Sequence, residues 1–308
     1  WFGHPLGLYV CFFTEMWERF AFYGLKALLF LYLTQHHLFT DKNGYLLLGT
    51  YAGLAYALPV VGGLLADKYL GMRKAVTFGG ALMAVGMLGM AYKGTQATVE
   101  GGADTIALQV MYASLALVAV GVGFLKPNIS TIVGRLYSEK DPRRDSAFTL
   151  FYMGINLGAV FSSLFVGWIG LAYGWEYGFG SAGIGLLCGL LVFVGGRAYL
   201  HGQAEPAQPE LLLEKVAGIR REWLIYLLSL VGVLVVQQIL QTSIDFGVLG
   251  QWLGLAPGAE ITATEVVAVA LTILLMVWWV KFIFIECDRI ERASMVMLMV
   301  LTAISAVF

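Results

Sequence analysis

The sequence has few charged residues and few of the side chains that build catalytic or metal centres. Charged residues make up 13% of the 308 residues, and there are only 4 histidines and 3 cysteines. The cysteines are odd in number and lie in or beside apolar segments, so they predict neither a disulfide framework nor a metal site. The net charge of −1 indicates no basic surface for nucleic acid.

What the sequence does have is long apolar stretches. Hydrophobic residues make up 59% of the chain and the mean hydropathy is +0.79, which is typical of a membrane protein. A helix needs about 20 apolar residues to cross a bilayer. We therefore predict an all-α polytopic membrane protein with spans at 6–33, 45–66, 75–92, 105–125, 148–173, 177–199, 223–240 and 265–285, and a last span that begins after residue 292.

These spans predict three parts. Residues 1–200 form a six-helix transmembrane bundle, and 201–287 form a polar linker with an inserted two-helix hairpin. Residues 288–308 are the start of a seventh helix, so we expect the chain to be a piece of a longer protein that has a second bundle. The hairpin helices carry almost no ionisable group, which predicts a place at the lipid-facing periphery and no transport chemistry.

Basic residues predict the orientation, because loops rich in Lys and Arg stay in the cytoplasm. The N-terminus is therefore expected in the cytoplasm of a multi-pass protein of the cell (inner or plasma) membrane. Two basic residues, Lys42 and Lys93, lie in the loops of one side. Thirteen lie on the other side: Lys68, Arg73, Lys74, Arg135, Lys140, Arg143, Arg144, Arg197, Lys215, Arg220, Arg221, Arg289 and Arg292.

The first span contains four ionisable side chains. Glu15, Glu18, Arg19, Phe22 and Lys26 are spaced by three and four, so they share one helix face. Each charge near the bilayer centre opposes insertion by roughly 2.5–3.5 kcal/mol, so this face must meet a bundle interior or a wet cavity. We interpret it as a proton-responsive strip in a transport pathway. The alternative is an ion-pair cluster that only fixes how the helices pack.

Glycine pairs spaced by four, at 49/53, 154/158 and 185/189, predict close helix packing. A different motif, Gly62-Gly63-Leu-Leu-Ala-Asp67-Lys-Tyr-Leu-Gly71-Met-Arg73-Lys74, resembles the loop between helices two and three of major facilitator transporters. Asp67 is expected to pair with Arg73 or Lys74 and to latch one conformational state. The alternative is an ordinary basic cytoplasmic loop.

Three further motifs resemble the proton-dependent oligopeptide transporter (POT) family. They are Glu-x-x-Glu-Arg-Phe-x-x-Tyr-Gly from Glu15, Lys126-Pro127-Asn128-Ile-Ser130, and Phe151-Tyr152-Met-Gly154-Ile-Asn156-Leu-Gly158. The resemblance implies a major-facilitator fold with twelve core helices in two halves, and two extra helices after the sixth. The chain would hold the first half, the extra pair and the start of helix seven.

The same resemblance implies roles for single residues. Glu15, Glu18, Arg19 and Lys126 would form the proton-coupling cluster, and Phe22 departs from the tyrosine that is common in the family. Since no histidine lies within a span, an intramembrane proton carrier must be a carboxylate. Arg19 and Lys126 also suit a clamp for a peptide carboxylate. The expected substrate-binding residues are Arg19, Tyr23, Lys26, Tyr56, Lys126 and Asn156.

We therefore predict a proton-coupled symporter that imports di- and tripeptides by alternating access. Its partners would be the peptide, the lipid bilayer and the C-terminal six-helix bundle, with protons as the coupling ion and no cofactor. One alternative is a related carrier of nitrate or another small anion. A remote alternative is an intramembrane enzyme that uses Glu15 and Glu18 as acid and base.

Overall fold

The computed structural model describes residues 3–216 and 218–242, together with single positions between 270 and 295. Residues 1–243 form one compact unit and 244–308 another, and the description below concerns the first. The predicted helix at 265–285, apart from those single positions, and the predicted start of a seventh helix lie outside the described residues.

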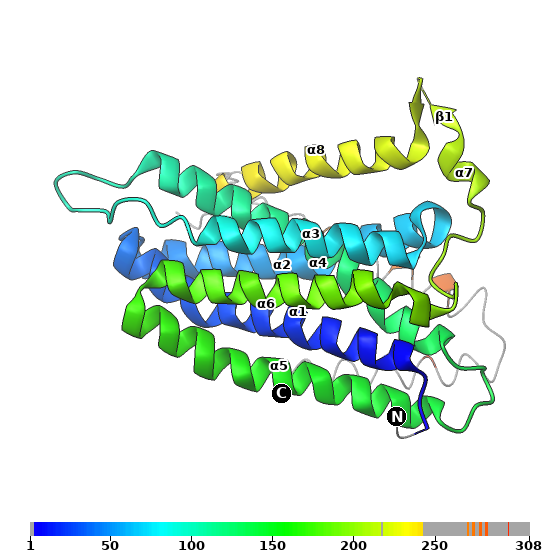
Figure 1. The fold of residues 1–308 in the computed structure, drawn as a ribbon. Coiled ribbons are helices and arrows are strands. Elements are labelled where there is room, and N and C mark those ends of the chain that lie inside the picture. The colour runs from blue at the N-terminus through cyan, green and yellow to red at the C-terminus, as the bar shows by residue number, and fades with distance from the viewer. Residues whose placement is uncertain are drawn as a thin grey trace. The chain divides into compact units, whose positions relative to one another are not determined.

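Six long helices form an antiparallel bundle (Figure 1), as the apolar spans predict. Helix α1 packs against α5 and α6, α3 packs against α4 and α6, and α2 packs against α4. Short helical turns η1 (Tyr32–His36), η2 (Ala66–Leu70) and η3 (Gly196–Leu200) extend three of the helices. The bounds are α1 Leu6–Leu31, α2 Asp41–Leu65, α3 Met72–Met90, α4 Thr105–Arg135, α5 Arg144–Tyr173 and α6 Trp175–Gly195.

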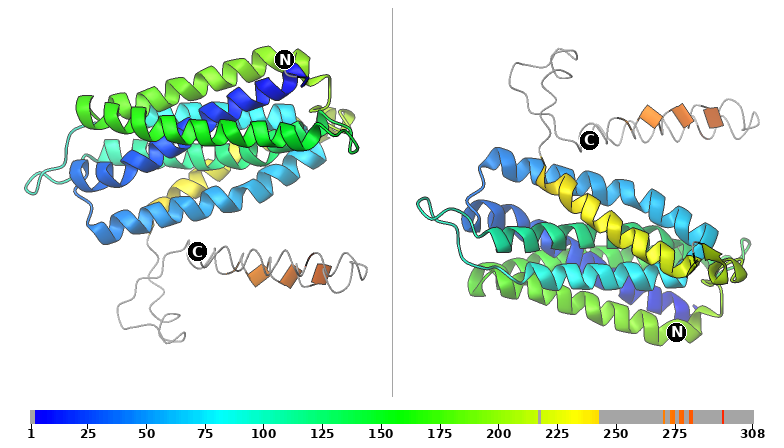
Figure 2. Two further views of the ribbon diagram at one scale, coloured as in Figure 1. Left: turned by 90° about the horizontal axis from the view of Figure 1, so that it is seen from below. Right: turned by 90° about the horizontal axis from the view of Figure 1, so that it is seen from above.

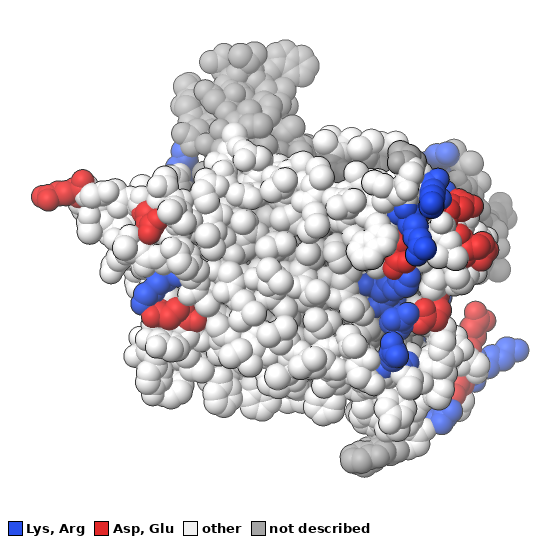
Figure 3. Space-filling view, turned by 45° about the horizontal axis from the view of Figure 1, so that its top comes forward, with Lys and Arg blue, Asp and Glu red and all other residues white. Residues whose placement is uncertain are grey.

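The bundle has the surface of a membrane protein. Five helical stretches of the described chain are long and apolar enough to cross a bilayer: 41–70, 105–135, 144–173, 175–200 and 221–241. In Figure 3 a broad band without charged residues separates two charged ends, and one of these ends carries most of the Lys and Arg side chains in view. The fold is therefore an all-α polytopic membrane protein. Helix α1 is not among the five and contains four ionisable residues.

Helix α4 is longer than predicted. It continues from Leu125 through Pro127 to Arg135, because the polar residues after Leu125 lower the hydropathy without ending the helix. Pro127 cannot donate to the carbonyl of Gly123. That carbonyl lies against α2, where a Cβ added at Gly62 would come within 2.2 Å of its oxygen. A glycine in α2 therefore permits the close approach of these two helices.

The predicted glycine packing is confirmed on α1 but is wrong at Gly49. A Cβ added at Gly158 of α5 would lie 2.3 Å from the carbonyl oxygen of Met16, and one at Gly189 of α6 would lie 2.8 Å from the Trp17 side chain. At Gly49 no heavy atom of the described residues lies within 4 Å of the added Cβ. Small residues thus bring α5 and α6 close to α1, whose middle carries the charges.

The linker after α6 is packed onto the bundle. It contains α7 (Glu210–Leu213) and a small antiparallel hairpin of β1 (Lys215–Val216) and β2 (Ile219–Arg220). Its Ala204 carbonyl accepts a hydrogen bond from the Arg73 amide at 2.9 Å. Gly71, with φ +74°, has no room for a side chain because a Cβ would lie 2.4 Å from the Pro206 nitrogen.

Helix α8 (Arg221–Gln241) packs along α4 and touches α2. Four apolar side chains, Ile225, Val233, Val236 and Leu240, are buried on its packed side, while Leu227, Leu230, Val231, Leu234 and Val235 are exposed. Helix α8 therefore lies at the edge of the described bundle, and the predicted lipid-facing position of the two-helix hairpin stays a prediction. Figure 2 shows α8 lying across the α2, α3 and α4 side of the bundle.

Candidate functional site

The middle of α1 buries three charged side chains. Glu15, Glu18 and Arg19 are 3%, 0% and 4% exposed. Nε of Arg19 lies 3.1 Å from Oε1 of Glu15 and forms a second, shorter ion pair with Oε2 of Glu18. The helix spacing predicted from the sequence therefore brings both carboxylates onto one guanidinium. We call these three residues the buried triad.

The buried triad is incompletely satisfied. Oε2 of Glu15, Oε1 of Glu18 and Nη2 of Arg19 are buried and have no hydrogen-bond partner among the described residues. The hydroxyl of Tyr51, on the neighbouring helix α2, is likewise buried and unpartnered, and it is close enough to interact electrostatically with Glu18 and Arg19. Buried polar atoms usually have a partner, and leaving one without costs about 1–3 kcal/mol. Unsatisfied hydrogen-bonding groups of this kind are not needed at a site that only holds helices together.

The charge of the buried triad is also unbalanced. Two ionised carboxylates and one guanidinium give a net charge of −1, in a region where an unpaired charge is strongly unfavourable. Lys126 of α4 interacts electrostatically with Glu15 and offsets part of that excess, and one proton on either carboxylate would remove it. The arrangement can therefore take up and release a proton as its surroundings change.

Phe22 occupies the same face one turn further on. Its ring lies beneath two cations, 5.1 Å from Cζ of Arg19 and 5.7 Å from Nζ of Lys26. Where the family commonly has tyrosine, the ring face remains available for cation–π contact but the hydroxyl is absent. Lys26 itself is exposed.

Lys126 of α4 lies over the ring of Tyr56 from α2, with Nζ 4.7 Å from the ring centroid. It makes no ion pair with a described residue, so the predicted pairing with Glu15 or Glu18 is not formed in this structure. Tyr56 is 66% exposed. The structure thus brings together two of the predicted substrate residues. The ammonium group of Lys126 forms no ion pair with a described residue, but it is close enough to Glu15 to interact with it electrostatically.

The other predicted substrate residues lie on α1 and α5. Tyr23 is half-buried, and Asn156 is exposed with its Nδ2 donating to the Tyr152 carbonyl at 3.1 Å. The left view of Figure 2 shows α1 crossing behind α5, from the α6 side toward α2. The exposed members of the predicted set, Lys26, Tyr56 and Asn156, come from α1, α2 and α5.

The predicted latch has different partners from those expected. Arg73 pairs with Glu205 of the linker, with Nη2 to Oε2 at 3.0 Å, and Lys74 pairs with Glu222 of α8 at 2.6 Å. Asp67 forms no ion pair with any residue of the described ranges, so its predicted pairing with Arg73 or Lys74 is not the one formed. The guanidinium of Arg73 holds the pKa of Glu205 below its usual range.

Sequence reasoning missed Tyr51 and the two acidic partners of the latch. A tyrosine in the middle of a span was a usable signal, because its hydroxyl needs a partner there. No comparable signal existed for Glu205 and Glu222, which lie more than 130 residues from Arg73 and Lys74 along the chain.

Comparison with known proteins places these features in a family. The sequence profile of the POT family matches residues 73–241, which is more than half of the chain. The peptide transporter YePEPT of Yersinia enterocolitica is 36% identical over 213 residues, covering 63% of this chain and 37% of that protein. Dipeptide and tripeptide permease A of Enterobacter sp. (strain 638) is 32% identical over 223 residues, covering 71% of this chain and 42% of that protein.

Solved structures give the same result. A crystal structure of a peptide transporter POT in complex with sulfate superposes with a TM-score of 0.68 at 32% identity, covering 96% of this chain and 56% of that one. The chain thus spans a little over half of that protein, and its matches cover about two fifths of the curated relatives. These relatives are transporters, which argues against the enzyme hypothesis.

Proposed function

Because this chain belongs to the POT family, we propose that the protein containing it imports di- and tripeptides together with protons by alternating access. The relatives supply the substrate class, since they are described as peptide transporters and as a dipeptide and tripeptide permease. Residues 1–200 would form one of the two halves that rock about a midplane site.

One observation carries the proton coupling. The buried triad holds two carboxylates against a single guanidinium, and each of the three side chains has one buried atom without a partner in the described part of the chain. We propose that Glu15 and Glu18 exchange a proton as the cavity opens to one side and then to the other. Arg19 can keep one carboxylate ionised while the other is protonated.

The substrate carboxylate is the second element of the proposal. Lys126 is not held in an ion pair, and Nη2 of Arg19 has no hydrogen-bond partner among the described residues. Together they offer a point charge and a planar fork for a peptide carboxylate. Tyr23, Lys26, Tyr56 and Asn156 would contact the rest of the peptide.

The partner of this half would be a C-terminal six-helix bundle of the same protein. Helices α2 and α5 expose large apolar side chains that a lipid-facing or helix-facing surface requires, among them Val60, Leu64, Leu157, Leu164 and Trp168. The matched parts make up 37% and 42% of the relatives' length, which leaves room for such a bundle.

A carrier of nitrate or another small anion is the second candidate. It is favoured by one observation, that a related transporter was solved in complex with sulfate. Arg19 and Lys126 could hold any small anion, because neither side chain distinguishes a carboxylate from an inorganic ion by charge alone.

Uptake by the full-length protein in proteoliposomes separates the candidates. With an inwardly directed proton gradient (acidic outside), we expect labelled dialanine to accumulate above its external concentration. We expect labelled nitrate not to accumulate. Collapse of the gradient with a protonophore should stop accumulation but leave equilibration. Accumulation of nitrate alone would establish the second candidate, and gradient-independent peptide accumulation would contradict proton coupling.

A further inference from the structure

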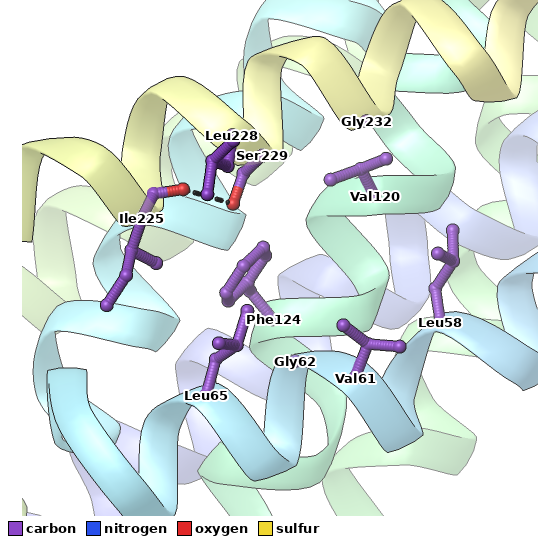
Figure 4. A pocket seen from close by; sticks show the side chains of 10 residues that line it. All are labelled: Leu58, Val61, Gly62, Leu65, Val120, Phe124, Ile225, Leu228, Ser229 and Gly232. Carbon is purple, nitrogen blue, oxygen red and sulfur yellow. Dashed lines mark hydrogen bonds between the residues drawn. The ribbon is translucent and has the colours of Figure 1, made fainter.

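An apolar groove lies between α8 and the bundle, away from the buried triad. It has a volume of about 250 Å³ and is lined by α2, α4 and α8 (Figure 4). Phe124 of α4 points between the other two helices. The lining contains one polar side chain, Ser229, and its hydroxyl already donates to the Ile225 carbonyl at 2.7 Å. The groove therefore offers nothing to a polar ligand.

The groove is open at its edge. Val61 of α2 and Leu228 of α8 line it and are 54% and 60% exposed. A Cβ added at Gly232 would have no heavy atom of the described residues within 4 Å, so the space along α8 is open within the described part of the chain. The lining contains no charged residue, as is required of a surface that meets the hydrocarbon region of a bilayer.

Cations gather where the groove ends at the basic end of the bundle. Lys68 follows the lining residue Leu65 by three positions, and Arg221 precedes Ile225 by four, so each lies one helical turn beyond the groove. Both cations lie over the ring of Tyr69, each 5.4 Å from its centroid. The ring thus holds a cation from α8 beside one from the end of α2.

The small hairpin adds two further cations at the same end. Lys215 and Arg220 are direct partners in the two-stranded ladder, although like charges opposite each other destabilise a strand pair. Figure 1 shows the hairpin projecting sideways at the start of α8. Beside these cations, Val216, Ile219 and Trp223 are exposed. Apolar and aromatic side chains next to cations suit the boundary between lipid tails and headgroups.

Most of these cations are not paired with an acidic residue of the described ranges. Arg221 pairs with Glu214 at 2.7 Å. Within residues 3–216 and 218–242, Lys68, Lys215 and Arg220 form no ion pair. A protein segment covering the groove would account for the apolar lining but not for three unpaired cations beside it.

We propose that this groove binds one acyl chain of an anionic phospholipid, drawn from the leaflet at the basic end of the bundle. Its phosphate lies among Lys68, Lys215 and Arg220, and its chain runs along α8 past Phe124 toward Gly232. The lipid fills the space between α8 and α2 and holds the inserted helix to the bundle. The site is separate from peptide transport and does not rest on it.

Native mass spectrometry of the full-length protein tests the headgroup contacts. Bound phosphatidylglycerol is compared with phosphatidylcholine of the same chains, in wild type and in a Lys68→Gln/Arg220→Gln variant. A basic residue near a membrane surface changes anionic-lipid binding by about fivefold, so the double variant should lose about 25-fold of its preference for phosphatidylglycerol. The matched control is Lys140→Gln/Arg197→Gln, which removes two exposed cations at the same end and should leave the preference unchanged.

The chain contacts need a separate variant. Gly232→Leu places a side chain in the open part of the groove and should weaken binding of both lipids by roughly tenfold. Gly195→Leu, on α6 with no heavy atom within 4 Å of its added Cβ, should have no effect. Salt provides a test without substitution, because raising it should release phosphatidylglycerol and not phosphatidylcholine from wild type.

Three results would overturn the proposal. One is an unchanged preference in Lys68→Gln/Arg220→Gln, and another is an equal loss in the control pair. The third is a Gly232→Leu variant that binds lipid as wild type does but has a lower melting temperature. That result would mean that a segment of the chain after residue 242, and not a lipid, occupies the groove.

Discussion

Helices α1 and α8 are both long and apolar, yet they differ in where their polar side chains lie and in whether these are paired. In α1 the charges lie mid-helix, are almost fully buried, and keep unpartnered atoms at Glu15, Glu18 and Arg19. In α8 the polar contacts to the bundle lie near its two ends and are paired. Glu222 pairs with Lys74, and Gln237 and Gln241 donate to Oε1 of Gln109 at 3.0 and 2.9 Å.

This difference indicates that the charges of α1 serve function, whereas the polar contacts of α8 attach that helix to the bundle. Paired polar groups near the ends of a helix fix its position at little cost, because the boundary region is wet. Buried charged groups with unsatisfied hydrogen-bonding atoms lower the stability of the fold. They are found where the protein's function requires the charges to exchange partners. We therefore expect changes in α1 to abolish coupling and changes at the ends of α8 to affect stability alone.

The largest effect is expected from the carboxylates of α1. Glu15→Gln, Glu18→Gln and the double variant keep the side-chain shape but cannot exchange a proton. Each should reduce pH-driven peptide accumulation to background, while counterflow, which needs no net proton movement, should stay within about tenfold of wild type. Glu139→Gln, in an exposed loop, serves as the control. Full uphill uptake by all three variants would remove the distinction between the two helices.

The next effect concerns the substrate carboxylate. A charge-assisted contact contributes about 1.5–3 kcal/mol, so a dipeptide amide should bind roughly 10- to 150-fold more weakly than the free acid. Lys126→Ala should weaken binding of the acid by a similar factor and have little further effect on the amide. Such non-additivity marks a direct contact.

Competition with a labelled dipeptide in wild type and variant supplies the four affinities, and Lys140→Ala is the control. If the two losses simply add, Lys126 acts on the buried triad rather than on the peptide.

A smaller effect is expected at the start of α8. Glu222→Gln removes the ion pair with Lys74, whose side chains are 24% and 27% exposed. Pairs of this kind contribute at most about 1 kcal/mol, so the melting temperature should fall by about 2–4 °C. Peptide transport should stay within about twofold of wild type. A tenfold loss of transport at unchanged expression would mean that α8 takes part in the cycle.

A stability effect of similar size, with no expected effect on transport, is predicted at the N-terminal end of α4. Asp104 caps this helix, and hydrogen bonds from the Thr95 amide, the Ala107 amide and the Thr95 hydroxyl lower its pKa to about 2. A carboxyl group whose pKa is lower in the folded state stabilises the fold at pH values above its pKa in the unfolded chain, which is near 4. This stabilisation is lost as the pH falls toward 2. Asp104→Ala should therefore lower the melting temperature by about 2–4 °C at pH 7 and by less at pH 3. An equal decrease at both values would exclude this titration.

The sequence predicted the bundle and the placement of α1 well, because hydropathy and helical spacing are local properties. Glu15, Glu18 and Arg19 meet as their spacing requires. The length of α4 was underestimated because Lys126 and Asn128 interrupt the apolar run without breaking the backbone hydrogen bonds. Gly49 fails as a packing residue because no neighbour lies against it.

Long-range partners could not be predicted. Arg73 and Lys74 find Glu205 and Glu222 only after α6 and the linker have folded back on α3. The same holds for Tyr51, whose closeness to the buried triad depends on how α2 packs. Spacing assigns residues to faces, and the fold decides which faces meet.

The central claim is that the buried triad holds an exchangeable proton. Infrared difference spectroscopy of the full-length protein, recorded as the pH is raised and again on dipeptide binding, follows the C=O stretch of a buried protonated carboxyl. We predict one such band in wild type that responds to both, is retained in Glu139→Gln, and is absent from Glu15→Gln/Glu18→Gln. A responsive band that survives in the double variant would place the proton elsewhere and contradict the account.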